Sequence, residues 1–279
     1  MPELPEVETV RRGLERLIVG RRITSVEVLK EKSYQVEEPL IGAAFTAARR
    51  KAKYLLLDLD NERTMVVHLK MTGQLVVSGD EHWGGGHPTD SLIGQPPDRS
   101  TRVIIDLDDG SRLFFNDQRI FGWIRLCSRE EAAAMVDCLG PEPMDVDAWP
   151  LFRQRVRRRA GSTIKAALLD QQVVSGIGNI YADEACWIAK VNPARRVGDL
   201  SSQALKRLLK AAADVMALSI ELGGSTDRNY VDAEGNRGSY LKFAQVFRLE
   251  GQPCSRCGTV IVKTRVAGRG THYCPCCQK

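Results

Sequence analysis

The chain has 279 residues, of which 43% are hydrophobic and 27% are charged, a composition typical of a globular protein with one large domain or two to three small ones. The formal net charge of +5 is compatible with a nucleic-acid partner but does not require one. The sequence contains no apolar run of the roughly eighteen residues that a membrane-spanning helix needs. Its first residues are acidic, whereas a signal peptide begins with positive charge and an apolar run. We therefore expect a cytoplasmic protein that does not associate with membranes.

The first half of the chain predicts one helix followed by strands. Apolar residues recur every three or four positions from Val7 to Leu17, which predicts an amphipathic helix over residues 4–19. Strand patterns bounded by turn signals follow at residues 22–29, 54–59, 64–70, 102–107, 111–116 and 122–126. They predict a β-rich domain, a sandwich or a barrel. Residues 79–100 are rich in glycine and proline and predict a mobile loop or an insertion.

The second half of the chain predicts helices. Residues 140–143 (GPEP) are the best candidate for a linker, and Ser201 is the expected N-cap of a helix over residues 202–222 that ends at two glycines. Basic residues crowd one short segment between these landmarks, at Arg153, Arg155, Arg157, Arg158, Arg159 and Lys165. Such a cluster fits a solvated helix face and a nucleic-acid surface equally well.

Eight cysteines divide into two groups. Cys127, Cys138 and Cys186 lie in apolar stretches and are expected to be buried as small hydrophobic residues. The last 26 residues hold the spacing Cys254-x2-Cys257 and Cys274-x2-Cys277, which brings four thiolates within tetrahedral reach of one zinc ion. Cys276 and His272 are competing ligands, but the paired spacing favours Cys277. Four thiolates leave no open position for water, so the zinc would be structural.

The segment between the cysteine pairs predicts a β-hairpin whose turn region carries Arg265 and Arg269. Such a hairpin could present arginine to DNA phosphates, or it could only secure the end of the chain. Residues 170–179 predict a helix, a tight turn and a second helix that begins at Asn179. Free backbone N–H groups at that helix start favour an anion such as a phosphate, although an N-cap Asn would explain the same pattern.

Six short segments carry a family resemblance. In chain order they are residues 2–8 (PELPEVE), 50–55 (RKAKYL), 68–73 (HLKMTG), 116–122 (NDQRIFG), 176–184 (GIGNIYADE) and the terminal cysteine pairs. They resemble, in the same order, motifs of the formamidopyrimidine-DNA glycosylase and endonuclease VIII family.

The resemblance implies an α+β fold in four parts, with DNA between the two main halves. An N-terminal β-sandwich catalytic domain with an N-terminal helix would occupy residues 1–130. A helix–two-turn–helix DNA-binding domain would follow over residues 141–225, a loop that covers the lesion over residues 226–242, and a zinc-finger β-hairpin over residues 243–279. The family acts on damaged double-stranded DNA, and its members act as monomers.

The resemblance also implies roles for individual residues. Pro2 would be the nucleophile once Met1 is removed, Glu3 the general acid in base release, and Lys53 an aid to β-elimination. Arg269 would contact phosphate and assist δ-elimination. The expected DNA-binding residues are Met71, Arg119 and Phe121, which would enter the duplex where the damaged base leaves, Asn179, which would bind a phosphate, and Arg159 and Lys165 of the basic cluster.

The chemistry of the N-terminus agrees with this assignment. A terminal amine has a pKa of roughly 8, so a substantial fraction is neutral and nucleophilic near pH 7. Proline supplies a secondary amine, and its attack on the sugar C1′ gives an iminium ion that acidifies the 2′ proton. Taken alone, Pro2 and Glu3 would be an ordinary helix start, because both residue types suit a first turn. The other matching segments favour the catalytic interpretation.

Some positions depart from the family pattern. Ile120 stands where a basic residue is usual, residues 100–102 (STR) stand where histidines are common, and Phe247 replaces a usual tyrosine. The segment from Thr226 to Gly238 resembles the loop of the branch that excises oxidised purines such as 8-oxoguanine. Two rival hypotheses remain: an enzyme for oxidised pyrimidines with the same chemistry, and a non-catalytic zinc-bearing DNA-binding protein.

Overall fold

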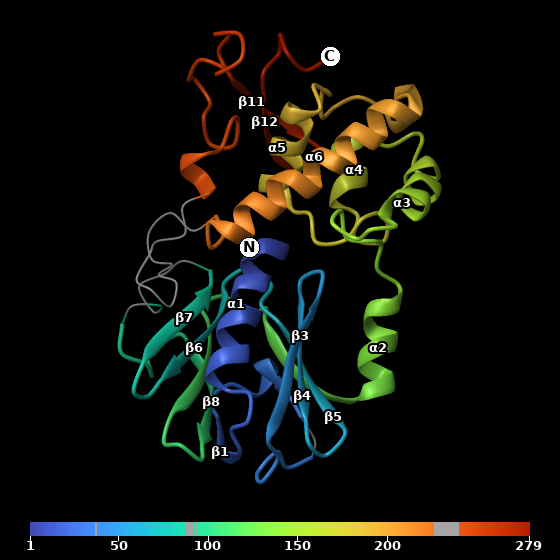
Figure 1. Cartoon of the computed structure of the whole chain (residues 1–279). Coiled ribbons are helices and arrows are strands. Elements are labelled where there is room, and N and C mark those ends of the chain that lie inside the picture. The colour runs from blue at the N-terminus through green and yellow to red at the C-terminus, as the bar shows by residue number, and fades with distance from the viewer. Residues whose placement is uncertain (37, 88–91, 93, 226–239) are drawn as a thin grey trace. The chain divides into compact units, whose positions relative to one another are not determined.

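A computed structural model describes residues 1–36, 38–87, 92, 94–225 and 240–279. The chain forms two compact units (Figure 1). The first unit comprises residues 1–137 and 222–239, and the second comprises residues 138–221 and 240–279. No helix of the described residues is long and apolar enough to cross a membrane. The predicted lesion-covering loop, including the segment from Thr226 to Gly238, lies almost wholly outside the described residues.

Helix α1 (Leu4–Leu17) opens the first unit and follows the predicted amphipathic pattern. Its residues Leu4, Val7, Val10 and Leu14 are buried. Glu3 is the N-cap residue, and Glu3 and Glu6 form a capping box in which each side chain accepts the other residue's backbone N–H. Proline in the first turn costs nothing, because that position has no intrahelical hydrogen bond to lose.

Two five-stranded sheets form the body of the first unit. One has the order β1-β8-β9-β6-β7 and the other the order β2-β10-β5-β4-β3. Side chains from both sheets and from α1 form one hydrophobic core. The strands are β1 (Ile23–Val28), β2 (Tyr34–Gln35), β3 (Phe45–Lys51), β4 (Tyr54–Leu59), β5 (Arg63–His68), β6 (Gly73–Ser78), β7 (His82–Gly86), β8 (Thr101–Leu107), β9 (Arg112–Asp117) and β10 (Trp123–Ser128). The predicted sandwich is confirmed, and helix α2 (Arg129–Asp137) follows the last strand.

The glycine-rich segment at residues 79–100 is not wholly a loop, which corrects the prediction. Residues His82–Gly86 form strand β7, which pairs antiparallel with β6 and packs against α1. Strand β7 and helix α1 are so close that residue 85 must be glycine: a Cβ on Gly85 would lie 2.7 Å from a methyl carbon of Val10. Glycine thus permits a close approach between strand and helix that a larger residue would prevent.

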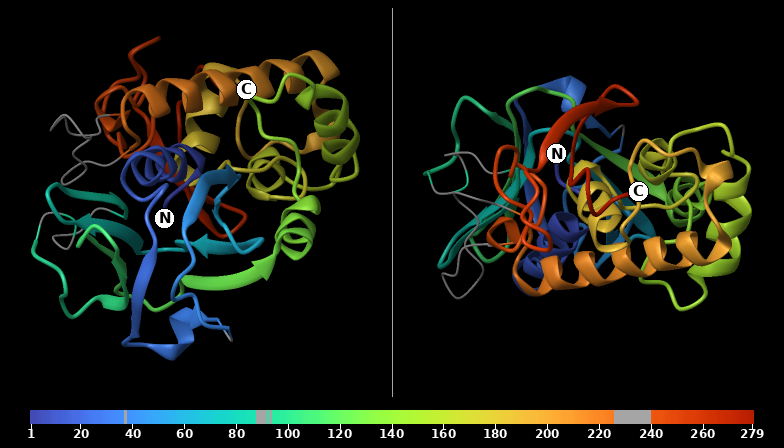
Figure 2. Two further views of the ribbon diagram at one scale, coloured as in Figure 1. Left: turned by 60° about the horizontal axis from the view of Figure 1, so that its bottom comes forward. Right: turned by 90° about the horizontal axis from the view of Figure 1, so that it is seen from above.

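The second unit is helical and ends in a small hairpin. Its helices are α3 (Ala148–Arg157), α4 (Ile164–Leu169), α5 (Asn179–Ile188) and α6 (Ser202–Glu221), and its hairpin pairs β11 (Val262–Val266) with β12 (Arg269–Tyr273). The long helix α6, orange in Figure 2, packs against α5. As predicted, the Ser201 hydroxyl caps its start by accepting the Ala204 N–H at 3.1 Å, and Gly223 and Gly224 follow its end with positive φ.

The predicted linker at residues 140–143 is packed inside the second unit. The Gly140 N–H donates to the Gln171 carbonyl at 2.8 Å. A Cβ on Gly140 would lie 2.6 Å from the carbonyl carbon of Val173, so glycine allows two backbone segments to touch. The chain therefore passes from one unit to the other before this segment, between Asp137 and Cys138.

Candidate functional site

The N-terminus is held in a defined conformation at the start of α1. Pro2 and Glu3 are both buried. The Glu3 N–H donates to Glu6 Oε2 at 2.8 Å, and the other oxygen of that carboxylate accepts the Ser225 N–H at 2.8 Å. Glu6 therefore holds both the residue after Pro2 and the residue that precedes the undescribed segment 226–239.

Lys53 lies beside a neutral imidazole in the first unit. Its side chain is 6% exposed, at the turn between β3 and β4. The ring of His68 meets Tyr54 edge-on with centroids 4.7 Å apart. Burial, reinforced by the positive charges of Lys70 and Lys53, lowers the pKa of His68 to about 3. The imidazole is therefore neutral near pH 7 and adds no positive charge of its own beside Lys53.

Met71, Arg119 and Phe121 come from two loops of the first unit. Met71 lies between β5 and β6, whereas Arg119 and Phe121 lie between β9 and β10. The ring of Phe121 is 47% exposed, and the Arg119 guanidinium lies 4.8 Å from the centre of that ring. The exposed ring and the guanidinium stacked on it therefore form one cation–π pair on the surface of the first unit.

The predicted zinc ligands converge in the second unit. The Sγ atoms of Cys254, Cys257, Cys274 and Cys277 all lie within 4.8 Å of one another. A tetrahedral zinc site with Zn–S distances of about 2.3 Å requires S–S distances of about 3.8 Å, so these four cysteines fit the ion. Cys276 is exposed and outside the group. The Trp187 indole N–H donates to Cys254 Sγ at 3.4 Å, a contact that orients this ligand.

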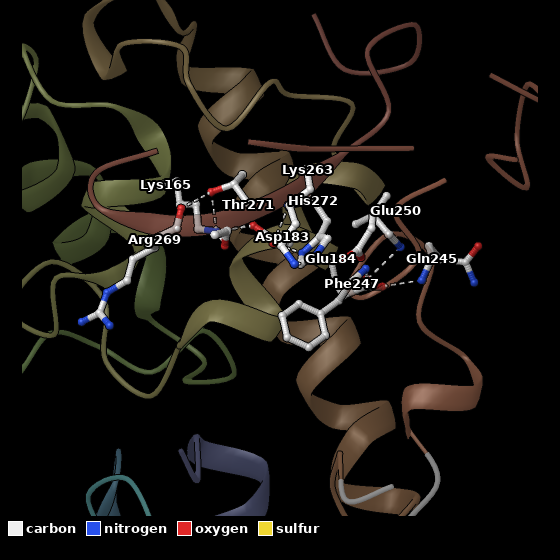
Figure 3. A network of polar contacts seen from close by, with 12 residues as sticks. Lys165, Asp183, Glu184, Gln245, Phe247, Glu250, Lys263, Arg269, Thr271 and His272 are labelled. Carbon is white, nitrogen blue, oxygen red and sulfur yellow. Dashed lines mark hydrogen bonds and ion pairs between the residues drawn. The ribbon is translucent and has the colours of Figure 1, made fainter. Parts of the chain in front are cut away.

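A buried network holds the hairpin that carries Arg269 (Figure 3). Lys165 Nζ lies 2.6 Å from Asp183 Oδ1, and both side chains are 0% exposed. The same ammonium donates to the Gly270 carbonyl at 2.9 Å and to Thr271 Oγ1 at 2.8 Å. The predicted contact between Lys165 and DNA is therefore wrong for this structure, because all three donors of the ammonium are used inside the fold.

Asp183 and Glu184 were not singled out from the sequence, yet both organise this unit. Asp183 Oδ2 accepts the backbone N–H of His272 at 2.9 Å and lies 3.3 Å from its ring Nδ1, so the His272 ring faces the network and not the cysteines. Glu184 accepts the N–H groups of Gln245, Val246 and Phe247 at 2.9, 3.0 and 2.8 Å. Burial raises the pKa of Glu184 above its usual value, although these hydrogen bonds oppose the shift. The available signal was two adjacent acids in the mostly apolar α5.

Asn179 is the first residue of α5, and the N-cap is Gly178. The Asn179 side chain therefore does not cap its own helix, contrary to the alternative interpretation. Its Oδ1 is buried and has no hydrogen-bond partner in the described part of the chain. An amide oxygen only accepts, so a phosphate would be bound by N–H groups at this helix start and not by this atom. Arg159, by contrast, forms an ion pair with Asp170 at 2.7 Å, so a phosphate would have to compete with that carboxylate.

Comparisons with known proteins agree with this arrangement. Residues 1–124 match the family model of the formamidopyrimidine-DNA glycosylase N-terminal domain. Residues 139–231 match the H2TH domain of the same enzyme, and residues 251–279 match a zinc finger found in FPG and IleRS. These matches cover the N-terminus, the helical region and the cysteine cluster.

Full-length relatives carry the same name. The chain is 44% identical to the formamidopyrimidine-DNA glycosylase of Herpetosiphon aurantiacus and 42% identical to that of Streptococcus mutans, with 100% of each chain covered. A Lactococcus lactis FPG mutant in complex with DNA containing Fapy-dG matches with a TM-score of 0.87 and 33% identity over 100% of both chains. The Lactococcus lactis Fpg with DNA containing an abasic site matches with a TM-score of 0.85 over 99% of both chains. This chain belongs to the formamidopyrimidine-DNA glycosylase family.

Proposed function

We propose that the protein is a bifunctional DNA glycosylase and abasic-site lyase of base excision repair that removes oxidised purines such as 8-oxoguanine and formamidopyrimidines. The observation that carries the proposal is Pro2, which directly precedes the rigid start of α1 in a chain whose full-length relatives are named formamidopyrimidine-DNA glycosylase. We further propose that the enzyme acts as a monomer on chromosomal DNA in the cytoplasm, and that residues 226–242 cover the lesion.

Removal of Met1 would free the secondary amine of Pro2 for catalysis. The neutral nitrogen attacks C1′ of the damaged nucleotide, so a C–N bond forms to the protein and the bond from C1′ to the base breaks. Glu3 supplies a proton to the departing base or to the opening sugar. The bond from C1′ to the ring oxygen O4′ then breaks, O4′ takes a proton and the sugar opens, which leaves an iminium ion between C1′ and Pro2. This ion accepts electrons when the 2′ proton is lost. The 3′ phosphate then leaves by β-elimination and the 5′ phosphate by δ-elimination.

Other residues position the DNA for this sequence of steps. Lys53 contacts a phosphate and assists β-elimination, and Arg269 contacts a phosphate and assists δ-elimination. Asn179 binds a phosphate near the lesion, at the positive end of α5. One zinc ion bound by the four clustered cysteines stabilises the hairpin that presents Arg269, and it takes no part in bond breaking. A role for Arg159 requires that its ion pair with Asp170 opens.

Borohydride trapping on a duplex with 8-oxoguanine opposite cytosine tests the mechanism. Reduction of the iminium ion should leave a stable protein–DNA adduct, which mass spectrometry would place on residue 2. Pro2→Gly keeps an amine but makes it primary, so the adduct should form much more slowly. An active enzyme that retains Met1, or an undiminished trapping rate in Pro2→Gly, would contradict the role of Pro2. Absence of any adduct would support a non-catalytic DNA-binding protein.

A second substrate class has one observation in its favour. Another matching structure is the wild-type Lactococcus lactis enzyme with DNA containing an oxidised pyrimidine, at a TM-score of 0.86. A panel of duplexes that each carry one lesion would rank the two classes by initial excision rate. We expect formamidopyrimidines and 8-oxoguanine to be cut faster than oxidised pyrimidines, and the reverse order would reassign the enzyme to the pyrimidine branch.

A further inference from the structure

A single buried carboxylate joins the two loops that carry Met71, Arg119 and Phe121. The side chain of Asp117 is 0% exposed. It accepts a hydrogen bond from the hydroxyl of Thr72, the residue after Met71. On its own loop it accepts the N–H of Arg119 at 3.1 Å, and its other oxygen accepts those of Phe121 and Gly122, both at 2.7 Å. Asp117 therefore bonds to both loops at once.

The loop around this carboxylate contains a strained residue. Ile120 has a φ of +56°, in the left-handed region that β-branched residues rarely adopt. A strained backbone persists only where its surroundings hold it. Here the residues on either side of Ile120 donate their N–H groups to Asp117. The carboxylate, together with the Thr72 hydroxyl that also accepts the Arg119 N–H at 3.0 Å, therefore keeps Ile120 in this conformation and turns Arg119 and Phe121 outward.

Close packing leaves this turn little freedom to rearrange. A Cβ on Gly122 would lie 2.8 Å from the Phe115 ring and 3.1 Å from Asp117 Oδ2. The other loop is held in a similar way: Lys70 has a φ of +48°, and its N–H donates to His68 Nδ1 at 3.0 Å. Both loops thus have their backbone conformation set by a buried acceptor before DNA arrives.

We propose that Asp117 is a positioning residue that holds the two loops together, despite the strain at Ile120. The side chains of Met71, Arg119 and Phe121 then form one preformed wedge that inserts into the duplex. The inference rests on the proposed glycosylase function. Asp117 touches neither the substrate nor the reacting atoms in this role. A preformed wedge does not pay the conformational entropy of ordering two loops while the base is extruded, so extrusion from duplex DNA is faster.

The test compares Asp117→Asn with the double variant Asp117→Asn, Ile120→Gly. Asparagine matches the shape of aspartate but turns one acceptor into a donor that faces backbone N–H groups. Glycine adopts positive φ without strain, so it should restore the turn when the carboxylate is gone. Gln118→Ala is the matched control, because Gln118 is an exposed residue of the same loop. Ile120→Gly alone should behave like the wild type.

Two readouts report on the wedge. Hydrogen exchange of the Arg119, Phe121 and Gly122 amides needs no DNA: Asp117→Asn should accelerate it by about tenfold or more, since each lost hydrogen bond contributes about 1 to 3 kcal/mol. Excision from an 8-oxoguanine duplex, with extrusion followed by 2-aminopurine fluorescence, should slow by about tenfold to a hundredfold in kcat. Borohydride trapping on single-stranded abasic DNA, which needs no insertion, should change less than about twofold, and the double variant should recover most of both losses.

The possible outcomes separate this proposal from the proposed function. Unchanged amide exchange in Asp117→Asn, or no recovery in the double variant, would overturn the positioning role even in an active enzyme. A parallel fall of duplex and single-strand trapping would also overturn it, because a general loss of folded protein lowers both. If the wild type gave no adduct at all, the glycosylase function would fail, and the exchange and fluorescence measurements would still decide whether Asp117 locks the wedge.

Discussion

The neutral state of the His68 imidazole has a consequence for stability. The unfolded chain binds a proton at this residue below a pKa of about 6.5, whereas the folded chain does so only near a pKa of about 3. Between these values the unfolded state binds more protons, so stability falls as pH falls. The ring accepts the Lys70 N–H through Nδ1, and a proton on that nitrogen would break the bond that sets the loop of Met71.

We therefore expect His68→Asn to remove part of the acid sensitivity. Between pH 7 and pH 4.5, the stability advantage of the wild type over this variant should shrink by about 2 to 3 kcal/mol, at about 1.4 kcal/mol per pH unit below 6.5. Guanidinium unfolding curves of both proteins at several pH values would measure it. If the difference in unfolding free energy between the two proteins stayed constant over this range, His68 would have the same pKa in the folded and the unfolded chain, and its burial would not cause the acid sensitivity.

Lys165 illustrates what the sequence reveals about single residues. Its place after five nearby arginines suggested an exposed basic surface, yet its partners are 18 and 106 positions away in the chain. Charge pattern reports local composition, whereas burial depends on contacts between distant segments. The zinc cysteines were predictable because a metal requires particular atoms at a particular spacing. Asp117 and Asp183 were not, because a buried acceptor has no sequence pattern of its own.

At the scale of elements, the contact between α1 and β7 changes the expected effect of a glycine-to-alanine substitution on stability. Replacing a glycine in a helix interior with alanine usually stabilises by about 0.5 to 1 kcal/mol. A methyl group on Gly13 of α1, however, would overlap the ring of Trp83 in β7, and that tryptophan is 4% exposed. The helix can therefore lie flat on the strand only because residue 13 has no side chain.

Gly13→Ala should accordingly destabilise the first unit, by about 1 to 3 kcal/mol, as overpacked cores do. Thermal or denaturant unfolding would measure the change. Adding Trp83→Leu should recover part of the loss by making room for the methyl group. Gly161→Ala is the control, because nothing lies within 4 Å of a Cβ at that position. Stabilisation by Gly13→Ala would show that α1 is not pressed against Trp83.

Helices and strands could be predicted from the sequence where the segment itself has a clear hydrophobic period or a strand-like composition. The helices at α1 and α6 and the strands β1, β4, β5, β8, β9 and β10 were predicted from the sequence, whereas β6 (GQLVVS) was not, despite its apolar residues. Strand β3 (FTAARRK) has alanines and basic residues that do not favour a strand, and its conformation comes from pairing with β4. Strand β7 (HWGGG) has the composition of a loop, and its pairing with β6 and contact with α1 impose the strand.

At the scale of the whole molecule, the net charge of +5 is small and gives little overall attraction to DNA. Binding therefore depends on individual positively charged side chains that contact phosphates. Many positive groups are already paired, such as Lys263 with Glu250 at 2.9 Å on the same hairpin that carries Arg269. Neutralising a phosphate releases counterions, so each true contact adds about 0.9 to the slope of log affinity against log salt. The salt dependence of binding therefore gives the number of phosphate contacts, which cannot be obtained from the composition of the chain.

Arg269→Ala should lower that slope by about 1, whereas Lys263→Ala should change it much less. Fluorescence anisotropy with a duplex that carries a tetrahydrofuran analogue of the abasic site, which has no C1′ leaving group and is not cut, would give both slopes over a series of salt concentrations. Zinc content must be the same in the variants, so that the hairpin is intact in each. Equal slopes for the wild type and Arg269→Ala would remove Arg269 from the phosphate contacts.

The carboxylate of Glu184 has one more consequence, because it bonds a helix to a segment that is distant in sequence. Together with Asp183 and its partners, it bonds residues 240–279 directly to residues 138–221. A gene divided between codons 222 and 240 should therefore give two polypeptides that reassociate. The two fragments could be expressed separately and mixed, and recovery of DNA cleavage would report that they had reassembled.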